Sequence, residues 1–204
     1  MLLFRCMIKN IIFDMGNVLI DFKPDLFLEK MGLSDPKDRK IILDNCVEKD
    51  YWLQYDLGKI NIDTLIQKSF ENVPNHLKKY TKELIRNWYK YAEVVKGMPE
   101  LVQELKDKGY KLYLLSNAGY NQPSYFKKFP YKLDGQVVSA FYHAAKPDPK
   151  IYEILLNKYH LKANECLFID DRPENILGST IPGIAIGITF TNIKELRKGL
   201  KKYL

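Results

Sequence analysis

Cysteine and histidine are scarce in this chain, with three of each among 204 residues. Cys6, Cys46 and Cys166 stand far apart and form no C-x-x-C pair, so the sequence predicts no disulfide framework. The absence of such a framework is typical of proteins in a reducing compartment, and we expect a cytoplasmic protein. The three histidines are scattered, and none stands beside acidic residues at metal-binding spacing.

Long apolar runs are also absent. No stretch approaches the length of a membrane span, and Arg5, Lys9 and Asp14 interrupt the segment where a signal peptide needs an apolar core. We therefore expect no membrane partner. The net charge is +7, but the densest basic stretch, residues 194–202, has the spacing of the exposed face of a terminal helix. Because no aromatic–basic motif accompanies this charge, we expect no nucleic-acid partner. The excess charge favours small anionic molecules instead.

The chain is long enough for one α/β domain with an insertion, or for two small domains. Its first clear element is an apolar run at residues 11–13, which ends at Asp14 and leads into a turn containing Gly16. An apolar run without polar alternation is typical of a strand that is buried on both faces of a parallel sheet. Asp14 then stands at the carboxyl end of that strand, where open α/β sheets bind ligands.

The segment from residue 21 to residue 95 has a different character. Pro24 and Pro36 suit the first turns of helices, and Asp35 suits an N-cap. Residues 63–70 and 75–91 carry apolar side chains at three- and four-residue spacing, which predicts amphipathic helices. No strand pattern occurs here, so we expect an all-helical insertion after the first strand.

Strands and helices alternate in the remainder of the chain. We predict one helix that begins at Pro99 and ends at Gly109, one that is capped by Asp148, and a terminal helix from about Asn192. The predicted strands are residues 110–115, 136–140, 166–169 and 183–188. This alternation predicts a parallel sheet with right-handed crossovers.

Polar residues follow several of these strands at the point where each strand ends. Asp14 follows the first strand, Ser116 the second, and Asp170 and Asp171 the fourth, while Lys146 comes after the third. In a parallel sheet these side chains meet at one edge. Three carboxylates cannot stay ionised together without positive partners, and Lys146 can neutralise only one. Hard carboxylate oxygens without a nearby histidine or cysteine cluster favour Mg²⁺ as the second partner.

Such a site suits attack of a carboxylate on phosphorus. Asp14 would form an aspartyl-phosphate and so divide one difficult hydrolysis into two easier steps. Lys146 and Mg²⁺ would stabilise the charge that develops on the phosphoryl oxygens. Ser116 and nearby backbone N–H groups would orient the phosphate.

Four motifs resemble those of the haloacid dehalogenase-like hydrolase superfamily, in the subgroup with a helical cap inserted after the first strand. They are F-D-M-G-N-V-L with Asp14, L-L-S-N with Ser116, A-K-P-D-P with Lys146, and F-I-D-D-R-P-E-N-I with Asp170 and Asp171. The resemblance covers nearly the whole chain. It implies a Rossmann-like α/β core of residues 1–20 and 96–204, with five parallel strands in the order 5-4-1-2-3, and a helical-bundle cap of residues 21–95.

The resemblance also implies a role for each motif residue. Asp14 is the expected nucleophile, and Lys146 the expected catalytic and phosphate-binding cation. Ser116 and Asn117 are expected to bind phosphate. The expected metal ligands are Asp14, the backbone carbonyl of Gly16, Asp171 and Asp170, with Asn175 as a supporting residue.

The asparagine that follows Gly16 is similar to a branch that includes sugar-1-phosphate phosphatases. This likeness implies an enzyme, a Mg²⁺-dependent phosphatase that acts on a small phosphorylated metabolite, in particular a sugar phosphate. We expect a monomer or a weak homodimer.

The sequence departs from the family pattern at one position. The phosphatases of this family place a second aspartate, a general acid, two residues after the nucleophile, where this chain has Gly16. Loss of a general acid typically lowers a rate by about 10²–10⁴-fold. Asp21 is one replacement to consider, although it also suits a turn before Pro24.

Two alternatives follow from this gap. A 2-haloacid dehalogenase needs no acid, because a halide leaves without a proton, and a non-catalytic protein could bind a phosphate ligand without turnover. The set of Ser116, Lys146 and two aspartates favours phosphate chemistry. In the insertion, Tyr51, Trp52 and Tyr55 could face a substrate, but aromatic residues at helical spacing are more often part of a core.

Overall fold

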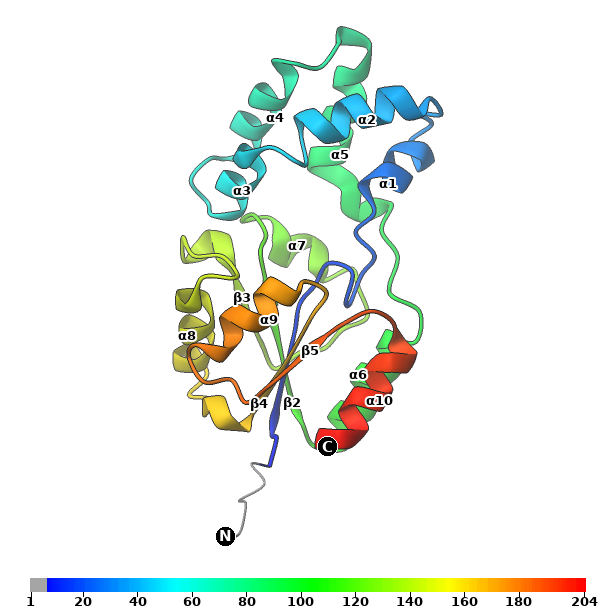
Figure 1. Ribbon diagram of the computed structural model, residues 1–204. Coiled ribbons are helices and arrows are strands. Elements are labelled where there is room, and N and C mark those ends of the chain that lie inside the picture. The colour runs from blue at the N-terminus through cyan, green and yellow to red at the C-terminus, as the bar shows by residue number, and fades with distance from the viewer. Residues whose placement is uncertain (1–6) are drawn as a thin grey trace.

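A five-stranded, fully parallel sheet forms the centre of the larger part of the molecule (Figure 1). The computed structural model describes residues 7–204, so Arg5 and Cys6 lie outside the described part. The strands are β1 (Asn10–Phe13), β2 (Lys111–Ser116), β3 (Gly135–Val138), β4 (Cys166–Asp170) and β5 (Ile186–Thr189). Their order is β3-β2-β1-β4-β5, which is the predicted order read from the opposite edge. The fold class predicted from the sequence is therefore confirmed.

The register of the sheet brings the strand ends together. Phe13, the last residue of β1, pairs with Leu114 on β2 and with Ile169 on β4. The backbone N–H of Asp14 donates a hydrogen bond of 2.9 Å to the carbonyl of Ile169. Asp14 and Asp170 therefore leave neighbouring strands at the same level, which places both carboxylates at the carboxyl edge of the sheet.

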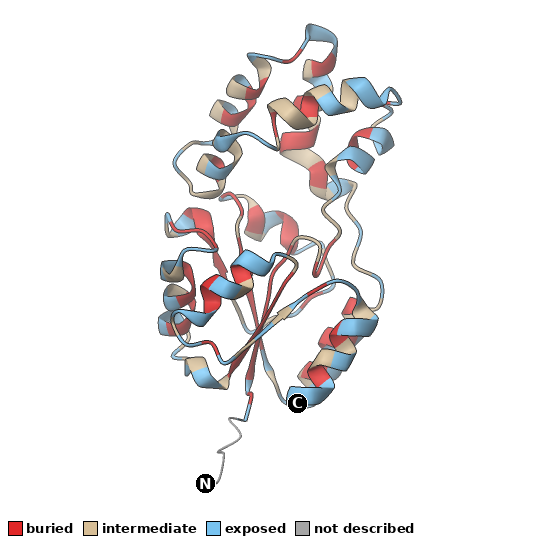
Figure 2. Ribbon diagram, viewed as in Figure 1, coloured by how far each residue is buried: buried red, intermediate tan, exposed pale blue. Residues whose placement is uncertain are grey.

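Helices cover both faces of this sheet, and its three central strands, β1, β2 and β4, are almost completely buried (Figure 2). Ile11 and Phe13 pack in a hydrophobic cluster with residues of α6 (Met98–Asp107) and α10 (Ile193–Tyr203). Ile12, between them, packs in a second cluster with residues of α8 (Pro149–Lys158). This alternation is the two-residue period of a strand, and it accounts for the unbroken apolar run in the sequence.

The chain between β1 and α6 is helical and lies beyond the carboxyl edge of the sheet (Figure 1). Its helices are α1 (Pro24–Lys30), α2 (Pro36–Asn45), α3 (Asp50–Asp56), α4 (Ile62–Phe70) and α5 (Lys78–Asn87). Asp35 caps α2 by accepting a hydrogen bond from the N–H of Lys37, as the sequence predicts. We assign residues 21–95 to a cap and the remainder to a core, and this division stays our assignment.

The two connections between core and cap run side by side. The N–H of Asp21 donates to the carbonyl of Glu93 at 2.8 Å, and the N–H of Val95 donates to the carbonyl of Leu19 at 3.1 Å. Ile20 and Val94 form an antiparallel bridge between these hydrogen bonds. The cap is thus joined to the core by a short paired ribbon.

Some element bounds differ from those predicted. The third strand ends at Val138, two residues early, because residues 139–141 form a 3₁₀ turn. The fifth strand begins at Ile186, because Gly183 has a φ of +90° and belongs to a turn. Helices α7 (Gln122–Phe126) and α9 (Pro173–Thr180) were not predicted individually.

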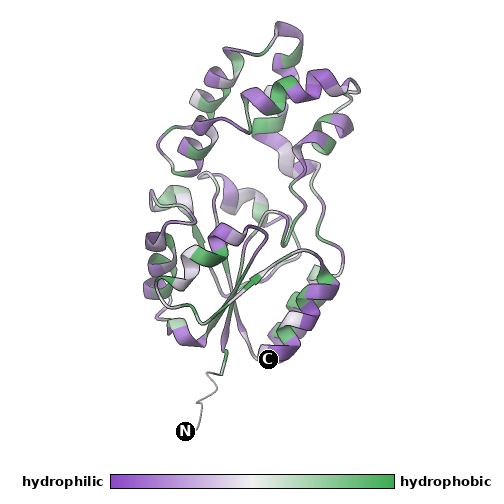
Figure 3. Ribbon diagram, viewed as in Figure 1, coloured by the Kyte–Doolittle hydropathy of each residue, from purple (hydrophilic) through white to green (hydrophobic). Residues whose placement is uncertain are grey.

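The basic terminal stretch has the form that its spacing predicts. Leu196 and Leu200 of α10 are buried, while Lys194, Lys198 and Lys201 are exposed. Figure 3 shows hydrophobic and hydrophilic bands alternating along this helix. Within residues 7–204, no helix combines the length and the apolar character needed to cross a bilayer.

Candidate active site

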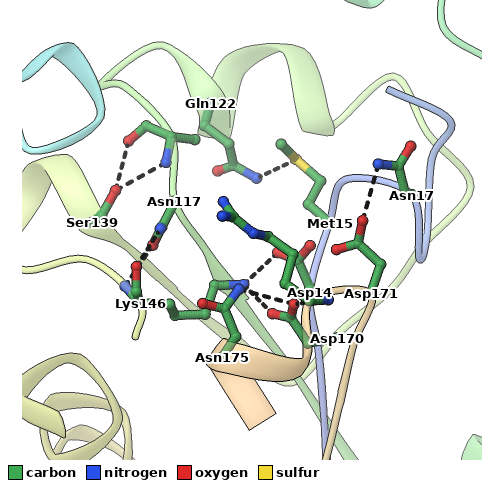
Figure 4. Close-up of polar contacts among 12 residues, drawn as sticks. Asp14, Met15, Asn17, Asn117, Gln122, Ser139, Lys146, Asp170, Asp171 and Asn175 are labelled. Carbon is green, nitrogen blue, oxygen red and sulfur yellow. Dashed lines mark hydrogen bonds and ion pairs between the residues drawn. The ribbon is translucent and has the colours of Figure 1, made fainter. Parts of the chain in front are cut away.

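Side chains from three separate parts of the core converge at the carboxyl edge of the sheet (Figure 4). Asp14 follows β1, Lys146 precedes α8, and Asp170 and Asp171 come from the end of β4. Asp14, Lys146 and Asp171 line a cavity of about 480 Å³ to which both the core and the cap contribute, and Asp170 lies behind them. The sequence therefore correctly predicts that these residues lie close together, and their chemical roles stay predictions.

Lys146 is the centre of the charge arrangement. Its Nζ donates to Oδ1 of Asp14 at 2.5 Å and to Oδ2 of Asp170 at 2.7 Å. The lysine side chain is only 1% exposed, and its Nζ lies 5.6 Å from the centre of the Phe168 ring. One ammonium group thus neutralises part of the charge of two buried carboxylates.

The Asn117 amide fixes the backbone of Lys146. Its Nδ2 donates to the carbonyl of Lys146 at 2.9 Å, and its Oδ1 accepts from the N–H of Lys146 at 2.8 Å. Each polar end of the amide has one partner, so the side chain holds the backbone of Lys146 in place. Asn117 also lines the cavity, and its contact with phosphate stays a prediction. Ser116 lines the cavity, and no residue within 7–204 forms a hydrogen bond with its hydroxyl group. That hydroxyl is therefore available to a ligand.

The two adjacent aspartates have different surroundings. Asp170 is fully buried, and its Oδ1 accepts hydrogen bonds of 2.9 Å from the N–H of Arg172 and from Nδ2 of Asn175. Because its Oδ2 is bonded to Lys146, both oxygens of Asp170 already have donors. Asp171 is half-buried, lines the cavity, and accepts one hydrogen bond of 3.1 Å from Nδ2 of Asn17. Asp171 is thus the more available ligand.

The donor set fits a hard divalent cation. Oxygen atoms of Asp14, Asp170 and Asp171 lie within 4.8 Å of one another, and the described residues add no histidine or cysteine to this group. Carboxylate oxygens of this kind match Mg²⁺ better than zinc.

The electrostatics of the cluster also call for additional positive charge. The pKa of Asp14 is raised to about 7, because burial and the charge of Asp170 raise it by more than Lys146 lowers it. Burial likewise raises the pKa of Asp171. Burial lowers the pKa of Lys146, but Asp14 and Asp170 outweigh this effect and raise it above its ordinary value. Lys146 alone is therefore insufficient to keep every carboxylate ionised.

The turn after Asp14 contains a residue whose role the sequence analysis missed. Asn17 has a φ of 55°, donates to Asp171, and accepts a hydrogen bond of 3.0 Å from the N–H of Phe22. A Gly-Asn pair after a strand is a signal for this left-handed turn. Gly16 also lines the cavity, and metal binding by its carbonyl stays a prediction. Asp21 forms an ion pair of 3.1 Å with Lys23 and does not line this cavity.

The cap supplies most of the aromatic residues that line the cavity, and α7 of the core adds Tyr125. Trp52 and Tyr55 line it, whereas Tyr51 does not and instead donates a hydrogen bond to the carbonyl of Asn45. The other three aromatic lining residues, whose place in the cavity was not predicted from the sequence, are Phe22, Trp88 and Tyr125. The ring of Trp88 packs edge-on against Phe22 at 4.9 Å and against Tyr125 at 5.1 Å. Phe22 also contacts Trp52 at 6.3 Å, so four of these rings form a connected aromatic group that lines the same cavity as Asp14, Lys146 and Asp171.

A model of the haloacid dehalogenase-like hydrolases matches residues 8–179, so the chain belongs to this family of hydrolases. It is 25% identical over 190 residues to a sesquiterpene phosphatase of Aspergillus oryzae, a match that covers 90% of each chain. It is 26% identical over 183 residues to a D-ribitol-5-phosphate phosphatase of Bacteroides thetaiotaomicron, covering 83% of this chain and 86% of the relative.

Solved structures of the same family share the fold. One is a family enzyme from Bacteroides thetaiotaomicron in complex with magnesium and inorganic phosphate, with a TM-score of 0.70, 22% identity, and coverage of 93% of this chain and 98% of that one. Another is an L-2-haloacid dehalogenase from Xanthobacter autotrophicus, with a TM-score of 0.67, 15% identity, and coverage of 96% and 83%. Since phosphatases and a dehalogenase share this fold, only the residues of the site can distinguish between the two activities.

Proposed function

We propose that the protein is a Mg²⁺-dependent phosphatase that hydrolyses a small phosphate monoester through an aspartyl-phosphate on Asp14. The observation that carries this proposal is the contact of Lys146 with both Asp14 and Asp170 at a cavity that Asp171 also lines. The phosphatase names of the two relatives and the magnesium and phosphate bound to the similar structure support it.

The proposed reaction has two steps. An oxygen of Asp14 attacks phosphorus, the bond from phosphorus to the leaving oxygen breaks, and a covalent phosphoryl group remains on Asp14. Water then attacks this phosphoryl group and releases inorganic phosphate. Lys146 holds Asp14 in place and neutralises charge on the phosphoryl oxygens, and the Ser116 hydroxyl donates a hydrogen bond to one of them. Asp14, Asp171 and the Gly16 carbonyl would hold Mg²⁺, which would add positive charge beside the phosphoryl oxygens.

We propose a sugar phosphate as the substrate. The cavity has room for a small metabolite, and the Trp52, Trp88 and Tyr125 rings offer a surface against which the apolar face of a sugar can pack. The names of the relatives include a polyol phosphate and a terpenoid, so the substrate panel should contain sugar, polyol and isoprenoid monophosphates.

The test is release of p-nitrophenol from p-nitrophenyl phosphate. We expect activity that requires Mg²⁺, stops when a chelator is added, and disappears in the Asp14→Asn variant. Asp44→Asn is a matched control, since Asp44 lies on the cap surface in an ion pair with Lys40, and it should keep full activity. Activity that survives in Asp14→Asn would show that the nucleophile is wrong.

Gly16 is the observation that favours a dehalogenase as the second candidate, because a halide needs no proton to leave. Chloride release from haloacetates, without phosphate release from any ester, would establish that candidate. Phosphate binding in a calorimeter without turnover of any ester would instead establish a sensor.

A further inference from the structure

The proposed reaction lacks one component. When phosphorus is transferred to Asp14, the leaving alkoxide needs a proton, and Gly16 has no side chain to supply it. Asp21 is bound to Lys23 and does not line the cavity. An acid that replaces the missing side chain must line the same cavity as Asp14, must lie outside the charged cluster, and must carry a proton near neutral pH.

Asp56, the last residue of α3 in the cap, meets the first two requirements. It lines the cavity with Asp14 and is partly buried, whereas Glu48, Lys49 and Asp50 of the same cap are exposed. Among residues 7–204, none donates a hydrogen bond to the Asp56 carboxyl group, and no cation pairs with it. The carboxyl group is therefore free to approach a ligand.

The backbone around Asp56 is fixed to the core by hydrogen bonds on both sides. The hydroxyl group of Ser139 donates to the carbonyl of Asp56 at 2.5 Å, and the hydroxyl group of Tyr55 donates to Oδ1 of Asn121 at 2.7 Å. One residue further, Nδ1 of His143 lies 2.8 Å from the carbonyl of Leu57. Core residues thus hold this turn of the cap against the cavity.

Two glycines allow the approach of cap and core to be this close. Gly119 of the core packs against Tyr55, since a Cβ at Gly119 would lie 2.2 Å from Cζ of that ring. Gly58 of the cap has a φ of +65°, and a Cβ there would lie 2.5 Å from the carbonyl oxygen of Ala140. Asp56 lies on the segment that these contacts position.

We propose that Asp56 is the general acid that protonates the leaving oxygen, in place of the side chain absent at Gly16. This inference rests on the proposed phosphatase function. Two properties of the residue support it. Burial raises the pKa of Asp56 to about 8, so that its carboxyl group is mostly protonated at pH 7. Its place at the carboxyl end of a helix also disfavours negative charge.

As the bond from Asp14 to phosphorus forms, the bond from phosphorus to the leaving oxygen breaks, and its electron pair stays on that oxygen. The Asp56 carboxyl group gives its proton to the same oxygen and becomes a carboxylate, and the alcohol departs. In the second step this carboxylate takes a proton from the water that attacks the phosphoryl group. Asp14 leaves as a carboxylate, and Asp56 is protonated again.

The test compares Asp56→Asn with the wild-type enzyme on two Mg²⁺-dependent substrates. An alkyl ester such as glycerol phosphate needs an acid, whereas p-nitrophenolate leaves without one. We expect kcat/KM for the alkyl ester to fall by about 10²–10⁴-fold, and kcat/KM for p-nitrophenyl phosphate to fall by less than about 10-fold. Asp44→Asn should change neither value. An equal loss on both substrates would overturn the assignment, because it would mark a structural role.

A second variant keeps the test independent of folding defects. A Cβ at Gly16 would lie 3.6 Å from Cβ of Phe22, which is ordinary contact, so a side chain can begin there without a clash. In the Asp56→Asn background, Gly16→Asp should restore at least about 10-fold of the alkyl-ester activity. Failure of this rescue, with wild-type-like circular dichroism, would argue against a missing acid. A wild-type enzyme inactive on both esters would instead refute the phosphatase function itself, and the assignment with it.

Discussion

Replacement of Lys146 by methionine tests the charge arrangement of the site most directly. The lysine side chain is 1% exposed and contacts two carboxylates, of which that of Asp170 is fully buried and that of Asp14 is 13% exposed. Methionine has a similar length but no charge. The variant therefore leaves both carboxylates without their cation, in a position that water can hardly reach.

The expected cost follows from the remaining contacts. Breaking a buried ion pair by removal of one partner typically destabilises a protein by about 3–5 kcal/mol. Asp170 keeps the donors from Arg172 and Asn175, and Asp14 borders the cavity, so we expect the lower end, about 3 kcal/mol. With a urea dependence of about 2 kcal/mol per M, the midpoint of unfolding should fall by about 1.5 M.

The loss of stability in Lys146→Met should increase with pH. The pKa of Asp14 is raised to about 7 in the folded protein, so the folded state binds more protons than the unfolded state. Its contribution to stability is therefore present at low pH and is lost as the pH rises through about 7. Without Lys146 the pKa of Asp14 rises further. The loss in free energy of unfolding caused by Lys146→Met should accordingly be larger at pH 8 than at pH 6.

The assay is urea unfolding in a chelating buffer, followed by far-ultraviolet circular dichroism. Tryptophan fluorescence is unsuitable as the sole probe, because both tryptophans, Trp52 and Trp88, lie in the cap. Lys40→Met is the matched control, since Lys40 pairs with Asp44 on the exposed surface, and it should change the midpoint little. A Lys146→Met protein within about 1 kcal/mol of the wild type at both pH values would refute the reasoning.

Three further results are expected. Gly58→Ala should raise KM, because its Cβ would meet the Ala140 carbonyl oxygen and separate the cap from the core. Gly32→Ala is the control, since Gly32 has a φ of +91° with open space around it, so that this variant should show only the backbone strain. Equal KM values for the two variants would contradict the close packing of the cap on the core. Asp171→Asn should weaken Mg²⁺ binding in a calorimetric titration by at least about 10–100-fold, more than Asp170→Asn, and the reverse order would exchange their roles. Mg²⁺ at 100 times its Kd should raise the free energy of unfolding by about 2.7 kcal/mol, and an unchanged midpoint would argue against a metal site.

Much of the core was predictable, because its signals are local. Asp35 and Asp148 cap the helices that follow them, and the apolar runs become the buried strands. Once the strands are parallel, the positions of Asp14, Lys146 and Asp170 at one edge follow from where each strand ends. The strand order depended on the resemblance to a known family, not on the pattern of residues.

The finer arrangement of the site was not predictable, because it depends on contacts distant in sequence. Nothing in the pair Asp170–Asp171 indicates which carboxylate pairs with Lys146 and which stays available. Asn117 turns to the Lys146 backbone 29 residues away. Asp56 has the sequence signal of an ordinary helix end, and only the packing of cap on core brings it to the cavity.

The paired ribbon between core and cap has a consequence for how such proteins diversify. The chain enters the cap at Asp21 and runs back beside that point at Glu93, and a hydrogen bond of 2.8 Å joins these two residues. A segment whose ends meet can be lengthened, shortened or exchanged without displacing β1 or α6. Exchange of the cap can therefore change which alcohol is recognised, while the nucleophile keeps its position. If the proton donor belongs to the cap, each exchange would alter substrate selectivity and leaving-group chemistry together.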